Sequence, residues 1–360
     1  MDLRRYNTII DCRSPSEYAE DHIPGAVSAP VLDDAERATV GSLYRQVSPF
    51  DAKKLGGALV AKNVARHVET LFAGQGRDWR PLVYCWRGGK RSAAMAHILR
   101  EIGWDAETLP GGYRSYRKWV VEELQELPSR LDFRVIHGPT GSGKSRLLTA
   151  LRRAGAQVLD LEDLAAHRGS VLGQLPDRPQ PSQKRFESLL LQELAAFDPA
   201  KMVFVEGESK KIGQLQVPEA LIERMRAASC ILLDTAIEVR VSLLLEEYRH
   251  FIENPAALDA QLDCLSGLHG RDKIAGWKSL AARGAWRDFV ALLLMEHYDP
   301  AYLRASRRNF AQLQSARQLA IRSAGDEAFD AAARLLVEGR DLLVEAGEHA
   351  HMLYDAPAER

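Results

Sequence analysis

The chain has 360 residues and a formal net charge of −1; 27% of its residues are charged and 46% are hydrophobic. This length predicts two or three domains of roughly 150 residues each, and the balance of residue types excludes disorder as the default state. A dedicated DNA-coating protein would be more basic, so DNA is not an expected partner. RNA stays open, because binding depends on where Lys and Arg cluster.

The four cysteines form no C-x-x-C pair, which argues against a zinc site or a disulfide framework. Residues 1–6 lack the apolar stretch of a secretory signal, and no run approaches the ~18 apolar residues of a membrane-spanning helix. We therefore expect a cytoplasmic protein with reduced thiols and no membrane association.

Short apolar runs alternate with helical patterns in the first third of the chain. Ser14 and Pro15 mark a helix start. Strands are predicted at 7–11, 81–84 and 107–109, and helices at 52–75, 92–102 and 115–127. Such alternation predicts a parallel sheet covered on both faces, and hence an α/β fold.

A linker is predicted at 128–130, which divides the chain into domains at 1–128 and 129–360. A second alternating unit follows, with strands predicted at 133–137, 157–161, 202–205 and 230–233. From Ile237 to Met352 the sequence predicts mostly helix.

Cys85 lies at a predicted strand-to-helix turn with the sequence YCWRGGKRS (84–92). The two glycines let the loop curl so that N–H groups point inward, and three cations, Arg87, Lys90 and Arg91, follow within six residues. These groups favour a thiolate, which suits a nucleophile that meets an oxyanion. Cys85 is therefore the candidate catalytic thiol. The other cysteines lack such surroundings and are expected to be structural, namely Cys12, Cys230 and Cys264.

Three segments resemble rhodanese domains: DCRSPSEY (11–18) with HIPGA (22–26), the Cys85 loop, and LPGGY (109–113). Together they cover about residues 1–125 and imply a rhodanese-like parallel-sheet domain. Five residues separate Cys85 from Arg91, which resembles the C-x5-R loop of cysteine phosphatases; sulfurtransferase loops are usually one residue shorter. The longer loop fits a phosphate ester, a thiophosphate or selenophosphate. Tyr84 stands where phosphatases often have His, which weakens the phosphatase interpretation.

The segment GPTGSGKS (138–145) satisfies the P-loop pattern G-x-x-x-x-G-K-[ST] between a predicted strand and a predicted helix. It predicts a P-loop NTPase-like α/β domain whose backbone N–H groups ring a phosphate. Lys144 would neutralise the outer phosphates, and Ser145 could bind Mg²⁺. The phosphate-binding residues are expected to be Gly138, Gly141, Gly143, Lys144 and Ser145. Glu206 is the first choice for a second metal ligand, with Asp160 and Asp234 as alternatives.

A rhodanese-like domain followed by a P-loop domain resembles the tRNA 2-selenouridine synthase family. VEGESKKIG (205–213) is similar to that family's second signature, and LDLE (159–162), HRGS (167–170) and HYDP (297–300) are similar to other family segments. The resemblance implies replacement of sulfur by selenium at the 2-position of a wobble 2-thiouridine, with selenophosphate as donor. It also implies geranyl transfer from geranyl diphosphate to that sulfur, with the S-geranyl species as intermediate, on tRNAs for lysine, glutamate and glutamine.

On this interpretation the P-loop holds the diphosphate of the geranyl donor, and Cys85 accepts or positions selenium while the loop cations bind the phosphate of selenophosphate. Mg²⁺ is a possible cofactor, and no tightly bound organic cofactor is expected. For tRNA we expect Trp86, which could stack on the target base or pack within its own domain, and the basic residues Arg304, Arg307 and Arg308. The alternatives are a rhodanese-fold cysteine phosphatase, a P-loop kinase or ATPase, and a noncatalytic binding module.

Overall fold

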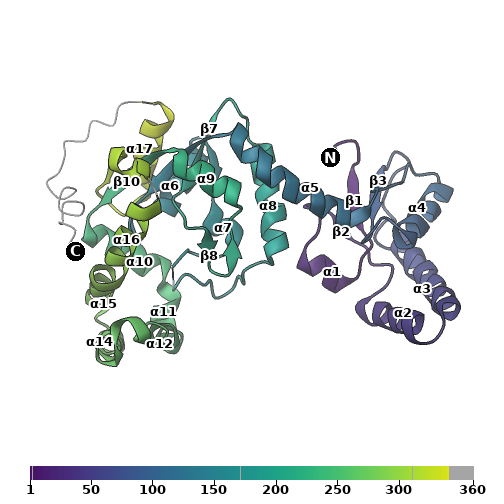
Figure 1. Ribbon diagram of the computed structural model, residues 1–360, viewed down its shortest axis with the longest axis horizontal. Helices are drawn as coiled ribbons and strands as arrows, with labels where there is room; N and C mark the ends of the chain where they lie inside the picture. Colours follow the sequence, from purple (N-terminus) through teal and green to yellow (C-terminus); the bar gives the residue numbers. More distant parts are fainter. Residues whose placement is uncertain (2, 171, 310, 340–360) are drawn as a thin grey trace. The chain divides into compact units, whose positions relative to one another are not determined.

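Two parallel sheets organise the chain, one in each of two units of the computed structural model (Figure 1). The structure describes residues 1, 3–170, 172–309 and 311–339, without the side chains of 305–309, 311 and 314. The first unit contains residues 1–124 and 181–192, and the second contains 125–180 and the residues from 193 onward.

The sheet of the first unit has four parallel strands in the order β2-β1-β3-β4. They are β1 (Thr8–Asp11), β2 (Val27–Ser28), β3 (Pro81–Tyr84) and β4 (Glu107–Thr108). The strands predicted at 7–11, 81–84 and 107–109 are confirmed. The register of β1 and β3 ends with Asp11 opposite Tyr84, so Cys12 and Cys85 follow side by side.

Helices flank this sheet: α1 (Pro15–Glu20), α2 (Asp34–Gln46), α3 (Pro49–Glu69), α4 (Lys90–Ile102) and α5 (Gly112–Glu126). Ser14 caps α1 in a capping box with Glu17, as its sequence predicts. α3 occupies most of the helix predicted at 52–75, but it ends at Glu69, and Phe72 beyond it is buried. α2 was not predicted, because it buries no side chain and so lacks an apolar stripe.

The second unit has five parallel strands in the order β11-β10-β5-β7-β6. They are β5 (Asp132–His137), β6 (Gln157–Leu159), β7 (Met202–Glu206), β10 (Ser229–Thr235) and β11 (Arg317–Ile321); a hairpin of β8 (Lys211–Ile212) and β9 (Leu215–Gln216) lies outside this sheet. The predicted linker forms a short 3₁₀ helix, η1 (Leu127–Arg130). In the described residues after Ile237 the expectation of mostly helix is confirmed, and β11 is an additional strand that was not predicted and lies beside β10.

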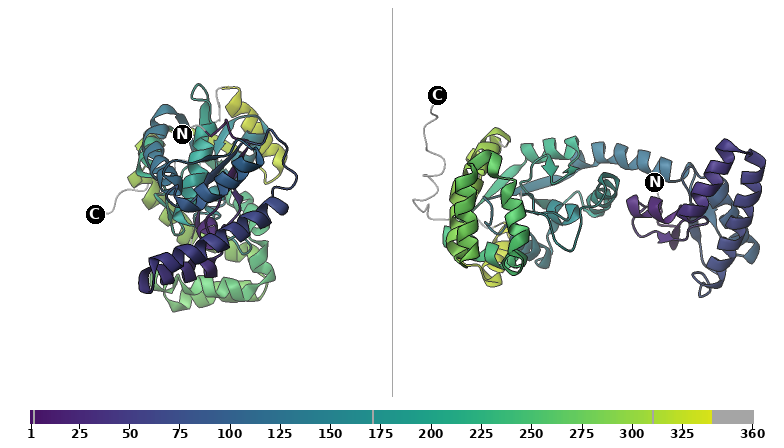
Figure 2. Two further views of the ribbon diagram at one scale, coloured as in Figure 1. Left: turned by 90° about the vertical axis from the view of Figure 1, so that its right-hand side faces the viewer. Right: turned by 90° about the horizontal axis from the view of Figure 1, so that it is seen from below.

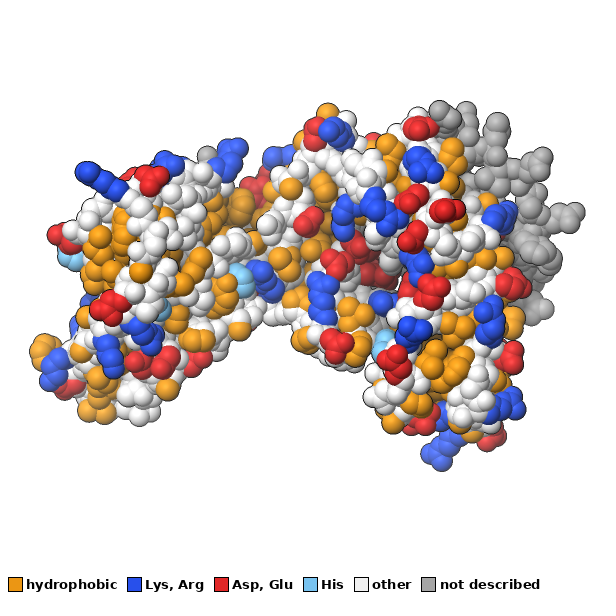
Figure 3. All heavy atoms as spheres, turned by 180° about the vertical axis from the view of Figure 1, so that it is seen from behind, with side chains coloured by type: hydrophobic (Ala, Val, Ile, Leu, Met, Phe, Trp, Pro, Cys, Tyr) orange, Lys and Arg blue, Asp and Glu red, His pale blue; other side chains and the backbone are white. Residues whose placement is uncertain are grey.

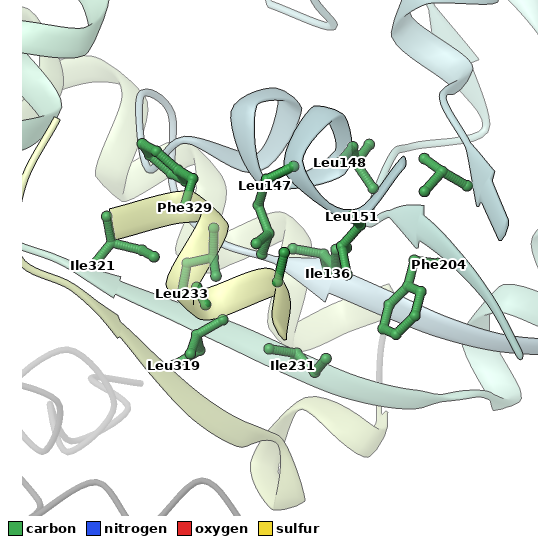
Figure 4. Close-up of a cluster of buried hydrophobic side chains, with 14 of the residues drawn as sticks. Ile136, Leu147, Leu148, Leu151, Phe204, Ile231, Leu233, Leu319, Ile321 and Phe329 are labelled. Carbon is green, nitrogen blue, oxygen red and sulfur yellow. The ribbon is translucent and has the colours of Figure 1, made fainter. Parts of the chain in front are cut away.

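The sheet is accompanied by α6 (Lys144–Arg153), α7 (Leu161–Ala165), α9 (Glu219–Ala227), α10 (Ile237–Glu247) and α17 (Asp326–Val337). Most of α8 (Gln183–Ala196) belongs to the first unit. Figure 4 shows the core between α6, α17 and the strands, where Leu147, Leu151 and Phe329 face Ile136 and Leu319.

A second group of helices packs around its own apolar cluster, away from the sheet (Figures 1 and 2). It contains α11 (Arg249–Glu253), α12 (Pro255–Asp263), α13 (Ser266–His269), α14 (Arg271–Ala282) and α15 (Trp286–Leu293). A π-helical turn η2 (Leu294–Tyr298), α16 (Asp299–Asn309) and a 3₁₀ helix η3 (Ala311–Ser315) lead to β11. Within the described ranges, no helix combines the length and apolarity needed to span a membrane.

Candidate functional site

The loop between β3 and α4 surrounds the Cys85 sulfur with hydrogen-bonding groups. The Gly89 N–H donates to Cys85 Sγ at 3.2 Å, and Ser92 Oγ lies 3.2 Å from the same atom. A hydrogen bond with Cys12 lowers the pKa of the Cys85 thiol to about 4, and those from Ser92 and Gly89 add to it; together they outweigh the effect of burial. Cys85 is therefore a thiolate at neutral pH. Hydrogen bonds from neighbouring groups are the main cause of this low pKa. The sequence had suggested that the cations of the loop contribute to it as well.

Cys12 is a neighbour of Cys85 that the sequence did not indicate. It is completely buried, and its Sγ donates to the Tyr84 carbonyl oxygen at 3.0 Å besides its contact with Cys85. Burial, and then the neighbouring Cys85, raise the pKa of Cys12 well above its usual value, so this thiol keeps its proton. Cys12 was expected to be structural; the structure adds that its sulfur contacts the Cys85 sulfur. Only the register of β1 and β3 brings positions 12 and 85 together, and no local motif reports it.

Of the three loop cations, Arg91 is the one held in place by a carboxylate. Its Nη1 lies 3.2 Å from Glu17 Oε2, and its side chain is 22% exposed. Arg91 and Trp86 line a hollow of about 460 Å³ together with Ser16, Glu17, Glu20 and Arg37. Arg87 and Lys90 are exposed. The Trp86 ring packs on Tyr113 with 5.4 Å between centroids, which matches packing within its own unit and leaves the ring only half-buried.

The end of the LPGGY segment and the residue after it donate hydrogen bonds to the backbone of the Cys85 loop. The Tyr113 N–H donates to the Cys85 carbonyl at 2.8 Å, and the Arg114 N–H donates to the Trp86 carbonyl at 3.0 Å. Gly112 has φ +60°, and a Cβ there would lie 2.2 Å from the Cys85 oxygen. A side chain at this position would push the loop apart, so the segment requires glycine here.

The first rhodanese-like signature builds a buried ion pair beneath the site. Arg13 and Asp11 are both buried, with Arg13 Nη2 2.7 Å from Asp11 Oδ2. The Tyr84 hydroxyl donates to the same Asp11 oxygen at 2.8 Å, and the Arg13 guanidinium lies 3.8 Å from the centre of the Tyr113 ring. This network ties β1, β3 and α5 together. Tyr84, which departs from the phosphatase pattern, therefore has a structural role.

The P-loop at 138–145 lies between the central strand β5 and α6. Gly143 has φ +89°, and a Cβ there would lie 2.6 Å from the Phe329 ring, so the loop requires glycine at this point. Lys144 Nζ donates to the Gly138 carbonyl at 3.1 Å, across the mouth of the loop. A residue from another helix fixes the backbone of the P-loop at Thr140: Arg240 Nε and Nη2 donate to the Thr140 carbonyl at 3.0 and 2.8 Å.

Arg240 is buried and pairs with Asp299, whose Oδ2 lies 3.0 Å from Nη1. This pair explains why an aspartate in the HYDP segment bears on a loop about 160 residues earlier in the sequence. Asp299 follows the π-helical turn η2, a feature that often marks functional sites. In the sequence, HYDP was notable only for its similarity to a family segment. Arg240 was not predicted as a site residue, because it lies in no local motif.

Four carboxylates gather beside the P-loop. The Ser145 hydroxyl donates to Glu162 Oε2 at 3.2 Å, and the Glu162 N–H donates to Glu206 Oε1 at 2.8 Å. Glu206 is buried, and its Oε2 has no hydrogen-bond partner among the described residues. Burial and then the Glu208 charge raise the pKa of Glu162 to about 8. Burial and then the charge of Asp160 raise the pKa of Glu206 well above its usual value. Glu162 and Glu208 were missed as site residues.

The P-loop lines a cleft of about 900 Å³ together with Asp160, Glu162 and Glu208, whereas Glu206 is buried behind them. Figure 3 shows acidic side chains in a hollow of this unit, with Lys and Arg side chains along its border. The cleft shares Thr140, Ser170, Leu244, Tyr248 and Tyr298 with an apolar cavity of about 60 Å³. The deeper wall of this cavity consists of apolar residues that include Phe251, Leu258, Trp286, Phe289 and Leu293.

The basic residues expected to bind tRNA lie in α16. Arg304 is exposed. Arg307 and Arg308 belong to the same helix, but their side chains lie outside the described residues. Arg304 is not among the residues that line the P-loop cleft, whereas Ala301 and Tyr302 of the same helix line it.

Comparison with known protein families matches two regions of the chain. Residues 2–118 match the rhodanese-like domain family, and residues 131–266 match the family of the tRNA 2-selenouridine synthase AAA domain.

Relatives of the chain are named tRNA 2-selenouridine synthase. A tRNA 2-selenouridine synthase of Shewanella halifaxensis is 31% identical over 323 residues, which cover 82% of this chain and 87% of the relative. Those of Nitrosomonas europaea and Bdellovibrio bacteriovorus are 36% and 34% identical over 67% of this chain, and the match spans only 63% and 64% of their lengths. The two loops described above, together with these matches, show that the chain belongs to the tRNA 2-selenouridine synthase family.

Proposed function

We propose that this protein is a transferase that replaces sulfur by selenium at the 2-position of the wobble 2-thiouridine of tRNA. The observation that carries the proposal is the Cys85 thiolate, set in a loop of hydrogen-bond donors and cations, in a chain of this family. The reaction runs through an S-geranyl intermediate. Alkylation turns the 2-sulfur into a good leaving group, which a selenium nucleophile then displaces.

Geranyl diphosphate is the proposed ligand of the P-loop. A diphosphate fits the N–H groups of 138–145 and the Lys144 ammonium, which also stabilise pyrophosphate as it leaves. Leu244 and Tyr248 line both the cleft and the apolar cavity, so apolar contacts for a part of the ten-carbon chain are available at the edge of the cleft. Such apolar walls suit an isoprenyl chain better than the polar groups of a base and ribose. This supports an isoprenyl diphosphate as the ligand.

Mg²⁺ fits the same loop. It would be held by Ser145 Oγ and the Glu162 carboxylate, with Glu206 behind Glu162. The buried Glu206 oxygen without a partner is consistent with a missing cation nearby. In the part of the chain that the structure describes, no three His, Cys, Asp or Glu side chains form a metal cluster, so ligand phosphates would complete the coordination. The ion would neutralise diphosphate charge.

Selenophosphate is the proposed substrate of the Cys85 loop. Arg91 is oriented by Glu17 beside the hollow, and Arg87 and Lys90 add exposed positive charge. These cations suit a phosphorus-centred oxyanion next to the sulfur.

The tRNA substrates are proposed to be the lysine, glutamate and glutamine isoacceptors. Trp86 offers a half-buried ring next to the reactive thiol, and Arg304 offers an exposed cation. If contacts go mainly to phosphates, affinity falls steeply with salt, and a flat response would contradict that surface.

Mass analysis of nucleosides tests the function. Thiolated tRNA is incubated with the protein and geranyl diphosphate, with or without selenophosphate. We expect S-geranyl-2-thiouridine in the first reaction and 2-selenouridine in the second. Unchanged nucleosides in both, with folded protein and intact tRNA, would overturn the proposal. Hydrolysis of an aryl phosphate or tRNA-independent turnover of ATP would then support a phosphatase or a P-loop kinase.

A further inference from the structure

The Cys85 loop contains groups that a simple selenium acceptor does not need. Ser92 follows Arg91 directly, and its hydroxyl lies 3.2 Å from Cys85 Sγ and 3.1 Å from the Gly89 carbonyl oxygen. The hydroxyl can therefore turn its proton toward the sulfur whenever negative charge returns there. Such a donor stabilises a thiolate that departs from a bond, besides one that attacks.

The space in front of the sulfur suits a tetrahedral oxyanion. The N–H groups of Gly89 and Ser92 point at Sγ from the start of α4, where helices favour anions. Arg91 lies 3.2 Å from Glu17 and lines the hollow of about 460 Å³ together with Trp86, which follows Cys85 directly in the loop. The loop N–H groups would face an oxyanion bonded to Sγ, and the oriented Arg91 guanidinium is the loop cation available to pair with it.

We propose that Cys85 attacks the phosphorus of selenophosphate, not its selenium, and carries the phosphoryl group as a phosphocysteine. The inference rests on the proposed function, which supplies selenophosphate as substrate. The Cys85 sulfur forms an S–P bond while the P–Se bond breaks, and the electron pair leaves on selenium as hydroselenide, protonated by solvent. Water then attacks phosphorus, the S–P bond breaks, its electron pair returns to Cys85, and phosphate and a proton are released.

Electron balance favours attack on phosphorus. No oxidation state changes along the phosphoryl route, and hydroselenide is the nucleophile that the exchange at the S-geranyl position needs. Attack on selenium would give a Cys85 selenenylsulfide and phosphite. Release of selenide from it would then require a two-electron reductant, which the proposed reaction does not supply.

The carboxylates of the hollow restrict the leaving group. Glu17 bonds to Arg91 and Arg37, and Glu20 pairs with Lys184 at 2.7 Å. Ionised carboxylates cannot protonate an alkoxide as it leaves. Hydroselenide and hydrosulfide are stable anions at neutral pH and need no such acid. The loop therefore suits selenophosphate and thiophosphate and disfavours alkyl phosphate esters.

The test uses the full chain without tRNA, with inorganic thiophosphate or selenophosphate as the probe. Mass analysis of the rapidly quenched protein should find one PO₃ unit on Cys85, with release of sulfide or selenide and phosphate. Ser92→Ala should raise the phosphorylated fraction about five- to tenfold, because loss of one hydrogen bond to the departing thiolate slows hydrolysis. Arg91→Lys should lower it about tenfold or more. Cys264→Ser, an exposed thiol in the other unit, is the matched control and should equal the unsubstituted chain.

Selenium on Cys85 with release of phosphite, or a Cys12–Cys85 disulfide, would overturn the proposal. So would absence of any adduct in both the unsubstituted chain and a Ser92→Ala protein that melts normally. The proposed function is judged separately by the nucleoside assay. A phosphocysteine without selenation of tRNA refutes only that function, and selenation of tRNA with selenium on Cys85 refutes only this inference.

Discussion

The Cys85 loop and the P-loop have the same position between a strand and a helix, but only the first contains a nucleophile of the protein. Each follows a parallel strand and precedes a helix, β3 and α4 for the Cys85 loop and β5 and α6 for the P-loop. In the first, backbone N–H groups already point at a thiolate of the protein. The second loop contains no cysteine; Lys144 reaches across it to Gly138, and the Glu162 carboxylate beside it accepts a hydrogen bond from Ser145.

This difference separates covalent chemistry from charge stabilisation. A loop that holds its own nucleophile can form a bond to the substrate. A loop that offers only donors and a cation can bind a leaving group and stabilise its charge. The surroundings differ as well, because the hollow beside Arg91 and Trp86 is lined mostly by charged and polar side chains, whereas the P-loop cleft shares lining residues with an apolar cavity.

Removal of the thiol should have the largest effect. Cys85→Ala should reduce selenation of tRNA to background, because the thiolate that reacts with selenophosphate is lost, and it should leave geranylation intact. Nucleoside mass analysis after separate reactions measures both. Equal loss of both activities in a folded protein would break the division between the loops.

Removal of the P-loop cation should have the opposite pattern. Lys144→Ala should slow geranylation by on the order of 10²- to 10³-fold, because one preorganised charge on the departing pyrophosphate is lost. Reaction with Cys85-directed alkylating reagents should not change. A variant that geranylates normally would show that the diphosphate binds elsewhere; Lys201→Ala, an exposed lysine, is the control.

The buried ion pair beneath Cys85 sharpens the comparison through stability. Asp11→Ala leaves Arg13 charged, buried and unpaired, and should destabilise the first unit by about 3–5 kcal/mol. Denaturant unfolding measures this. A loss below about 1 kcal/mol would mean that the network in β1, β3 and α5 contributes little.

Glu162 beside the P-loop should make the folding stability fall as pH rises, whereas a salt-bridged carboxylate makes it rise. The folded-state pKa of Glu162 is raised from 4.5 to about 8, so the folded protein holds a proton that the unfolded chain has lost. Stability should therefore fall as pH rises between these values. Glu162→Gln should flatten that slope, and Mg²⁺ with a diphosphate should restore stability at high pH. An unchanged slope in thermal melts would contradict the assignment.

The smallest effect concerns Cys12. Cys12→Ala removes the leading cause of the low pKa of Cys85, so that pKa should rise while the thiol stays reactive at alkaline pH. The rate of iodoacetamide alkylation against pH reports it. If the pH profile does not shift, Cys12 does not lower the pKa of Cys85, and the hydrogen bonds within the loop are sufficient to keep the thiolate.

Local motifs predicted the centres of both sites, and long-range contacts supplied the rest. Cys85 and the P-loop stand in contiguous patterns at strand-to-helix turns, where sequence alone indicates position and chemistry. Cys12 reaches Cys85 through strand register, and Arg240 reaches Thr140 from a different helix, so neither leaves a local pattern. The same reason applies to the fold. Apolar strands were found, whereas α2 buries nothing and β11 is a short strand among helices.

The most direct test of the division between the loops supplies the intermediate ready-made. S-geranylated tRNA and selenophosphate are given to the Lys144→Ala and Cys85→Ala proteins, and 2-selenouridine is measured. The account predicts that Lys144→Ala converts this tRNA about as well as the unsubstituted chain, whereas Cys85→Ala does not convert it. Failure of Lys144→Ala, or conversion by Cys85→Ala, would contradict it.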